Sequence, residues 1–342
     1  MSGYGDLTGL YLLVSSGRQG SFNCWVKTPE RQERGASDMH QRDPNFDRLI
    51  TETQPNGLVA LDLMSTTELV ELMNQGDARV PGAVALARDQ IASAIDGIVA
   101  RIQGGGRLIY VGAGTSGRLA VLDATECGPT FGAGPELIQT VLAGGDAAMV
   151  RPAEEVEDDA GTGAIDLRAR SVTARDAIVG VSASGRTPYV LEALEHARGE
   201  RALTIGLVGN PSSPIARQVD LPIEIVTGAE VIGGSTRLKA GTAQKLVLNM
   251  ISTITMVRLG RTFGNLMVDV RTSNEKLRMR ARKIIRLATD CSDEEARRAL
   301  DSAKGEAKIA ILMLLTGDTP AAAAERLKQH DGHLRNALGS SQ

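Results

Sequence analysis

The chain has 342 residues, a formal net charge of −3 and 42% hydrophobic residues, enough for one large domain or two ordinary ones with an apolar core. The slightly acidic balance excludes a general nucleic-acid binder, which needs a basic surface, and no apolar run approaches the ~20 residues of a membrane helix. The three cysteines are far apart and form no C-x-x-C pair. Together with a start that lacks signal-peptide features, they predict a cytoplasmic protein with reduced thiols.

The first part of the chain divides into a tail and a helical region. Residues 1–40 are rich in Gly, Ser, Arg and Gln without periodicity, and this predicts a poorly ordered tail. Met39 is a candidate for the true translation start. Residues 41–96 predict N-terminal helices, with Ser65 as the N-cap of a short amphipathic helix. A second helix is predicted over 81–103.

Five short apolar runs then alternate with helical patterns, at 107–111, 136–144, 176–182, 202–209 and 221–226. Continuous Val/Ile/Leu runs separated by helices are typical of a buried parallel sheet. Helices are expected on both faces of that sheet. Residues 97–261 therefore predict a three-layer α/β/α sandwich.

The remaining chain predicts helices only. We expect a connecting helix over 262–284 and a small helical bundle over 285–342. Within the bundle, Ser292 and Glu295 form a capping box, and Thr319 precedes a proline at the first position of another helix.

Three glycines follow the first predicted strand. Gly112, Gly114 and Gly117 have the spacing G-x-G-x-x-G, which is typical of a dinucleotide-binding turn. Such a turn also needs an acidic residue at the end of the second strand, to hold the ribose hydroxyls. Here that strand ends at 142–144, and Asp146 comes only beyond the turn. The pattern therefore disfavours a nicotinamide enzyme, and no cofactor is predicted.

A second loop favours a sugar phosphate instead. Ser182, Ser184 and Thr187 follow the third predicted strand and precede a helix, and Thr115 and Ser116 hold the equivalent place after the first strand. Hydroxyls beside a helix N-terminus bind an anion without any lysine. Two such loops on neighbouring strands would form one crevice at the carboxyl ends of the sheet. The alternative is a pair of ordinary serine-rich turns.

The stretch 228–253 supports the same crevice. Ser235 and Thr236 follow two glycines and can cap a long helix. Lys239 lies on that helix, and with Ser235 it is a candidate contact for the phosphate. The alternative is simply a well-capped helix. The four histidines form no convincing ligand set, so no metal is predicted.

Several segments together carry a family resemblance: GGGRLIYVGAGTSGRLAVLDATECGPTFG, SASGRTPYV, GAEVIGGSTRLKAGTAQKLVLNM and FGNLMVDV. The chain resembles the sugar isomerase (SIS) domain family and, more narrowly, the bacterial N-acetylmuramic acid 6-phosphate etherases, which are related to the glucokinase regulatory protein. The resemblance covers about residues 47–338 and implies a SIS domain with a UBA-like C-terminal domain. Gly233 is a departure, because relatives usually carry Thr or Ala there.

The resemblance implies a lyase of cell-wall sugar recycling. Such an enzyme converts N-acetylmuramic acid 6-phosphate and water to N-acetylglucosamine 6-phosphate and D-lactate. The family's two active-site glutamates fall on Glu126 and Glu157. From the residues alone, a helix end before Gly128 would bring Glu126 back towards the crevice, whereas Glu157 would belong to a solvated acidic cluster. We favour Glu126 as the proton carrier for lactate and water and Glu157 as an assisting acid/base. Which of them removes the C2 proton stays open.

The resemblance also implies a homodimer with its sites near the subunit interface, and a small-molecule sugar phosphate as the ligand. Neither nucleic acid nor a membrane is expected as a partner. Two rival functions remain. A sugar-phosphate isomerase shares the C2 proton abstraction, and a non-catalytic sugar-phosphate-sensing regulator shares the binding site.

Overall fold

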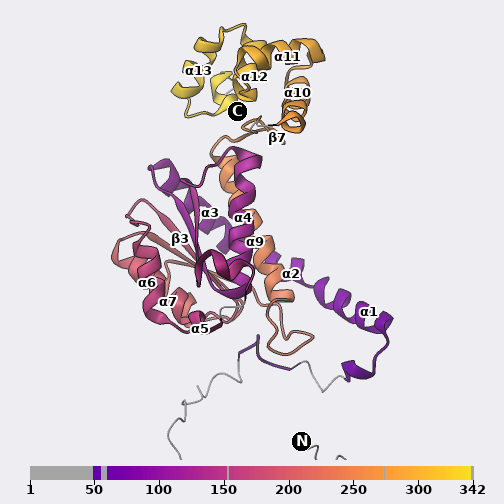
Figure 1. Cartoon of the computed structure of the whole chain (residues 1–342), viewed down its shortest axis with the longest axis vertical. Helices are drawn as coiled ribbons and strands as arrows, with labels where there is room; N and C mark the ends of the chain where they lie inside the picture. Colours follow the sequence, from indigo (N-terminus) through magenta and orange to yellow (C-terminus); the bar gives the residue numbers. More distant parts are fainter. Residues whose placement is uncertain (1–48, 55–59, 152–153, 271, 273, 340–342) are drawn as a thin grey trace, which may run out of the picture. The chain divides into compact units, whose positions relative to one another are not determined.

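A computed structural model describes residues 49–54, 60–151, 154–270, 272 and 274–339. The predicted tail at 1–40 lies outside the described residues, and so does the start of the predicted N-terminal helical region. All elements below belong to one unit of the chain that starts at Pro44. They are labelled in Figure 1.

Five parallel strands form the central sheet: β1 (Leu108–Gly112), β2 (Ile138–Leu142), β3 (Ala177–Ser182), β4 (Leu203–Val208) and β5 (Leu221–Glu224). Their order across the sheet is β2-β1-β3-β4-β5. In this register Leu108 of β1 pairs with Ile138 of β2 and with Ala177 of β3. The predicted parallel sheet is confirmed. Because β1 and β3 are neighbours, the two loops that follow them lie at the same edge.

Helices cover both faces of the sheet, because alternate strand residues point to opposite sides. Leu108 and Tyr110 belong to one hydrophobic core, and Ile109 and Val111 to the other. The first core packs under α2 (Val80–Leu86), α3 (Arg88–Gln103), α4 (Gly114–Phe131) and α9 (Lys239–Arg258), and the second under α6 (Ala160–Arg168), α7 (Pro188–Gly199) and α8 (Pro214–Gln218). Figure 1 shows α4 and α9 side by side and α6 and α7 across the sheet. The predicted three-layer sandwich is confirmed.

Short helices precede the sandwich: η2 (Leu61–Leu63) and α1 (Thr66–Asp77). Ser65 caps α1 as predicted, since its hydroxyl accepts from Glu68 N and the Glu68 carboxylate accepts from Ser65 N at 2.7 Å. The single helix predicted over 81–103 is two helices. Ala87, with φ −95° and ψ 13°, leaves the helical conformation and separates α2 from α3.

The helix predicted over 262–284 is wrong in its first part. Residues there form two short antiparallel strands, β6 (Thr262–Phe263) and β7 (Leu266–Met267), and α10 (Glu275–Thr289) starts later. Gly264 has φ +58° in the turn between the strands, a conformation that glycine adopts at little cost. Asn274 then starts α10, because its side chain accepts from Leu277 N at 2.9 Å.

The C-terminal helices pack around a separate core: α11 (Asp293–Ser302), α12 (Ala307–Thr316), α13 (Pro320–Gln329) and α14 (Leu334–Ala337). The capping box at Ser292 and Glu295 and the cap at Thr319 are confirmed. Among the described residues, no single helix has the length and apolar character to cross a membrane; only α12 with α13 passes by length and composition, as a pair bent by 104°.

Candidate active site

A pocket of about 270 Å³ lies where β1 and β3 end, close to the lower size limit of small-molecule sites. It brings together six of the predicted site residues: Thr115, Ser116, Glu157, Ser182, Ser184 and Thr187. The rest of its wall is formed by Glu52, Ala113, Gly114, Arg118, Val181, Ala183 and Thr236. The expected crevice between the two loops is therefore confirmed, while the role of each residue stays a prediction.

The glycines of the first loop have packing roles. A Cβ on Gly112 would lie 2.8 Å from Gly117 Cα, so both glycines are needed where β1 turns into α4. Gly114 has φ +51°, and a Cβ there would collide with Oε1 of Glu157. The G-x-G-x-x-G spacing thus serves a close strand–helix contact and the approach of a carboxylate.

Hydrogen bonds within the second loop involve all three of its predicted hydroxyls. Ser182 Oγ accepts from Gly185 N at 3.0 Å and lies 2.8 Å from Thr187 Oγ1, and Ser184 Oγ accepts from Arg186 N at 3.2 Å. A hydroxyl that accepts a backbone N–H keeps its own proton for another acceptor, but one of the two hydroxyls in the Ser182–Thr187 pair donates its proton to the other. Helix α7 begins immediately afterwards, with Thr187 as its N-cap. Its first residue, Pro188, has no N–H, and Val190 N and Leu191 N donate to Thr187 O, so the first turn contributes mainly a dipole that is favourable for an anion.

Ser116 is arranged differently from these serines. Its Oγ donates to Oε1 of Gln244 on α9 at 3.0 Å, and both side chains are buried. A hydroxyl has a single proton, so in this arrangement Ser116 can accept from a ligand but not donate to it. An anion needs donors, and the hydroxyls of the second loop can offer more of them than Ser116 can.

Glu157 lies in the pocket, although it belongs to an acidic cluster that would ordinarily be solvated. It ends the short helix α5 (Glu154–Glu157), which follows η3 (Gly145–Met149). Its carboxylate reaches the start of α4 beside Gly114, and its side chain is half-buried. The residues alone favoured a solvated acidic cluster here, and the family resemblance favoured the site; the structure has the second arrangement.

Glu126 lies far from this pocket. It is exposed and sits ten residues beyond Ser116 on α4, which is about 15 Å along the helix axis. The expected helix end before Gly128 is wrong, because α4 runs through Pro129 to Phe131. Its last turn closes with Gly132 N donating to Gly128 O, and Gly132 has φ +64°. The role of Glu126 therefore stays a prediction.

Glu230, not Ser235 or Thr236, caps α9. The helix begins at Lys239, and the buried Glu230 carboxylate accepts from Lys239 N at 3.1 Å and Ala240 N at 2.9 Å. A carboxylate at a helix N-terminus satisfies free donors and interacts favourably with the dipole. The expected capping role of Ser235 and Thr236 is wrong. Of those two residues, only Thr236 lines the pocket.

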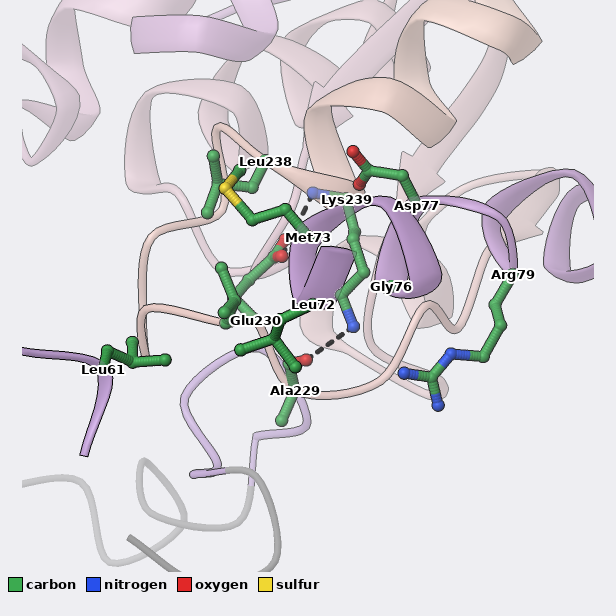
Figure 2. A pocket seen from close by; sticks show the side chains of 11 residues that line it. Leu61, Leu72, Met73, Gly76, Asp77, Arg79, Ala229, Glu230, Leu238 and Lys239 are labelled. Carbon is green, nitrogen blue, oxygen red and sulfur yellow. Dashed lines mark hydrogen bonds between the residues drawn. The ribbon is translucent and has the colours of Figure 1, made fainter. Parts of the chain in front are cut away.

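Lys239 is directed away from the candidate site. Its Nζ donates to Ala229 O at 2.6 Å and Thr227 O at 3.1 Å, and its side chain is buried. Figure 2 shows it in a separate pocket, which is also lined by Leu72, Met73, Gly76 and Glu230. The ammonium group already holds the 227–229 loop, so this geometry gives no support to the predicted phosphate contact.

Sequence reasoning missed two charged residues of the pocket wall. Arg118 donates to Ala148 O at 2.8 Å and Arg151 O at 3.0 Å, so it holds the segment before α5. Glu52 comes from the N-terminal segment, far away in the sequence. Neither has a local pattern that marks it. Arg118 does lie three residues after Thr115, on the same face of α4, and this spacing alone could have suggested it.

Comparisons with known proteins agree with this geometry. Residues 90–198 match the glucokinase regulatory protein N-terminal SIS domain, and 154–254 match the SIS domain. The phosphoheptose isomerase of Francisella tularensis is a similar solved structure, with a TM-score of 0.46 and 18% identity over 57% of this chain and 100% of that one. These values are too low to carry an argument about function.

Curated relatives are much closer in sequence. The N-acetylmuramic acid 6-phosphate etherase of Rubrobacter xylanophilus is 57% identical over 297 residues, which is 87% of this chain and 98% of the relative. That of Streptomyces avermitilis is 55% identical over 86% of this chain and 95% of the relative. Identity at this level over nearly the whole of both proteins exceeds what a shared fold requires. The chain therefore belongs to the N-acetylmuramic acid 6-phosphate etherase family.

Proposed function

We propose that this protein cleaves the lactyl ether of N-acetylmuramic acid 6-phosphate, giving N-acetylglucosamine 6-phosphate and D-lactate. The observation that carries the proposal is one pocket that holds both an acid/base candidate, Glu157, and a hydroxyl loop beside a helix N-terminus. The curated relatives of this chain have the same activity in their names.

The chemistry requires proton transfers at two carbons. In the open-chain sugar, C2–H is acidic because it is next to the C1 aldehyde. A base removes this proton, the electron pair forms a C2–C3 double bond, and the C3–O bond breaks to release lactate, whose oxygen takes up a proton. Water then adds at C3, and C2 regains a proton. Positioned carboxyl groups can perform such transfers.

We assign the phosphate to the loop of Ser182, Ser184 and Thr187 and one proton-transfer role to Glu157. The first assignment is supported by Ser184, whose hydroxyl accepts from Arg186 N and keeps a proton for the anion. The Ser182–Thr187 pair shares one proton internally and has one left. The second assignment is supported by the position of the Glu157 carboxylate, which lies beside Gly114 in the loop that follows β1. A ligand that spans both loops would place its phosphate and its reacting carbons at opposite sides of the pocket.

We further propose that the protein is a homodimer. A groove of about 480 Å³ crosses α2, α3 and α9 and has an almost entirely apolar lining: Pro81, Val84, Ala85, Ile91, Ala92, Ile95, Leu246, Met250 and Ile254. Met250, Ile254 and Val257 are 38–44% exposed and share one face of α9. Arg88, Asp96 and Arg258 lie at its edge. Charges of both signs suit a two-fold contact, in which each patch meets its own copy.

A dimer would also give Glu126 a route to a site. This residue cannot reach the pocket of its own protomer, but it is exposed on α4, next to Leu122 on the same helix face. We propose that Glu126 of one protomer acts as the proton carrier in the pocket of the other. We name the loop of Ser182, Ser184 and Thr187 the serine loop. Each site would then combine Glu157 and the serine loop of one copy with Glu126 of its partner.

A mixed dimer tests this arrangement. Glu126→Gln and Glu157→Gln subunits, given different affinity tags and co-expressed, yield a purified heterodimer with one site intact and one site doubly changed. We expect it to regain about half of the wild-type activity, because only one of two equivalent sites works. If both glutamates serve the same protomer's site, every site carries one change and the heterodimer is as inactive as its parents.

The release of D-lactate from the 6-phosphorylated substrate separates the proposed reaction from its rivals. An isomerase would exchange the C2 proton with solvent without releasing lactate. A sensing regulator would bind the sugar phosphate and do neither. Failure of the wild-type protein to release D-lactate would contradict the proposed function.

A further inference from the structure

The N-terminal segment 49–54, which we name the strap, is fastened to the candidate site by Asn210. Asn210 lies just after β4 and is 3% exposed. Its Oδ1 accepts from Ile50 N at 2.8 Å, and its Nδ2 donates to Thr51 Oγ1 at 3.0 Å. The same Nδ2 lies 3.2 Å from Ala183 O and 3.3 Å from Ser184 O. One buried amide thus joins the strap to the loop that contains Ser184.

Glu52 is carried by the strap into the pocket wall. It follows Thr51, which is 3% exposed and therefore fixes the backbone beside it. On its other side, a Cβ on Gly234 would lie 3.0 Å from Oε2 of Glu52. The carboxyl group is thus held between the serine loop and the loop that precedes α9, and it lines the same pocket as Ser182 and Glu157.

The chemistry of the pocket restricts what Glu52 can contact. A carboxylate repels a phosphate, so it must face the uncharged part of a sugar phosphate. Burial raises the pKa of Glu52, and this effect is larger than that of the hydrogen bond from Thr51, which lowers the pKa. Arg118 also lines the pocket, but its guanidinium group donates to the backbone carbonyls of Ala148 and Arg151. Its hydrogen bonds are therefore directed at the segment before α5. The hydroxyl groups of a bound sugar would supply donors that a partly desolvated carboxylate needs.

We propose that Glu52 is a specificity-determining residue that accepts hydrogen bonds from the sugar hydroxyls, and that Asn210 is the positioning residue that holds it there. The identity of the sugar phosphate in this inference rests on the proposed function. The geometry requires only a phosphorylated polyol whose phosphate lies at the serine loop.

The first test separates KM from kcat. Glu52→Ala should raise KM for N-acetylmuramic acid 6-phosphate by about 10–150-fold, as expected for lost hydrogen bonds to a charged group, while kcat changes less than about threefold and thermal unfolding is unchanged. Glu52→Gln keeps an acceptor oxygen and should give a smaller rise. Glu195→Gln, an exposed carboxyl on α7, is the matched control. An unchanged KM would overturn the inference, and so would a fall in kcat alone.

The second test asks whether Asn210 acts through Glu52. Asn210→Ala should raise KM as Glu52→Ala does, and should add little in the Glu52→Ala background, because coupled residues are not additive. If Asn210→Ala fails to fold, Thr51→Val serves the same comparison, because it removes the acceptor of the Asn210 Nδ2 bond together with the hydroxyl that bonds Glu52. Fully additive effects would overturn the positioning role.

Calorimetric binding of the product, N-acetylglucosamine 6-phosphate, distinguishes failure of this inference from failure of the proposed function. Wild-type protein that binds this ligand but releases no D-lactate would contradict the etherase, and a Glu52-dependent affinity would still support the contact. Equal affinity of wild type and Glu52→Ala would overturn the contact, whatever the activity. No binding by the wild type would overturn both.

Discussion

The two ends of the central sheet use polar side chains in opposite ways. At the amino end, Asp176 precedes β3 and is 1% exposed. It accepts from Arg107 N at 2.9 Å, Nε at 3.1 Å and Nη2 at 2.8 Å, and from Thr173 N at 2.9 Å. At the carboxyl end, Ser184 and Glu157 face an open pocket. One end has its partners within the chain, and the other directs polar groups at a cavity.

This difference separates stability from binding. A buried polar group is costly unless it is hydrogen-bonded, so the Arg107–Asp176 contact holds β1 and β3 together at their first residues. Polar groups that face a pocket stabilise the fold less, because they stay partly hydrated and lose less by the removal of a partner. Changes at the amino end should therefore reduce stability, whereas changes at the carboxyl end should reduce activity without unfolding the protein.

The largest effect is expected for Glu157→Gln. Loss of a positioned acid/base typically costs about 10²–10⁴-fold in rate, and the amide keeps the size of the side chain beside Gly114. We expect kcat for D-lactate release to fall within this range while the thermal unfolding midpoint stays unchanged. Exposed Glu195→Gln should retain full activity. Near-normal turnover of Glu157→Gln would remove it from the catalytic assignment.

Asp176→Ala should mainly reduce stability. Removing one partner of a buried ion pair costs about 3–5 kcal/mol, and we expect the lower end, about 3 kcal/mol, because the Arg107 side chain is 25% exposed and keeps contact with water. Urea unfolding measures the loss. The protein that remains folded should show an unchanged KM, and a raised KM with unchanged stability would contradict the comparison of the two ends.

Ser184→Ala should weaken phosphate binding. A hydrogen bond to a charged group contributes roughly 1.5–3 kcal/mol, so the specificity constant for the 6-phosphorylated sugar should fall about 10–150-fold. A poor substrate without the phosphate has nothing to lose there and should be nearly unaffected. Equal losses on both sugars would mean that Ser184 supports the loop, through its bond from Arg186 N, instead of binding the phosphate.

The smallest expected effect is the pH dependence of the stability that Asp176 contributes. Burial acts to raise the pKa of this carboxyl, but the hydrogen bonds from Arg107 and Thr173 outweigh it, and the pKa is lowered. An acid with a depressed pKa stabilises the folded state above its unfolded value, near 3.9, and loses this contribution as the pH falls through its folded value. The stability difference between wild type and Asp176→Asn should thus stay constant from about pH 7 to 5 and narrow below about pH 4. Urea unfolding at each pH checks this, and a difference that persists unchanged at pH 3 would contradict the lowered pKa.

Local patterns predicted most of the sandwich. The five apolar runs correspond to β1–β5, because continuous Val/Ile/Leu runs between helices bury both faces of a strand. Capping signals at Ser65, Ser292 and Thr319 marked helix starts correctly, since a cap bonds a backbone N–H only three residues away. Two other expectations failed because a nearby residue had a different role. Glu230 caps α9 in place of Ser235, and Gly264 turns the chain where a helix was expected.

The sequence by itself determined the strand–turn–helix loops, the hydroxyls after β1 and β3, and the family to which the chain is similar, because these depend on residues close together in the chain. Only the tertiary structure decided which groups share the pocket. Glu157 reaches Gly114 from a separate helix, Lys239 is held by backbone carbonyls, and Glu126 lies about 15 Å away along α4. The strap that carries Glu52 is fastened by Asn210, about 160 residues later in the chain, and no local pattern can specify a contact whose partners meet only after the sheet has formed.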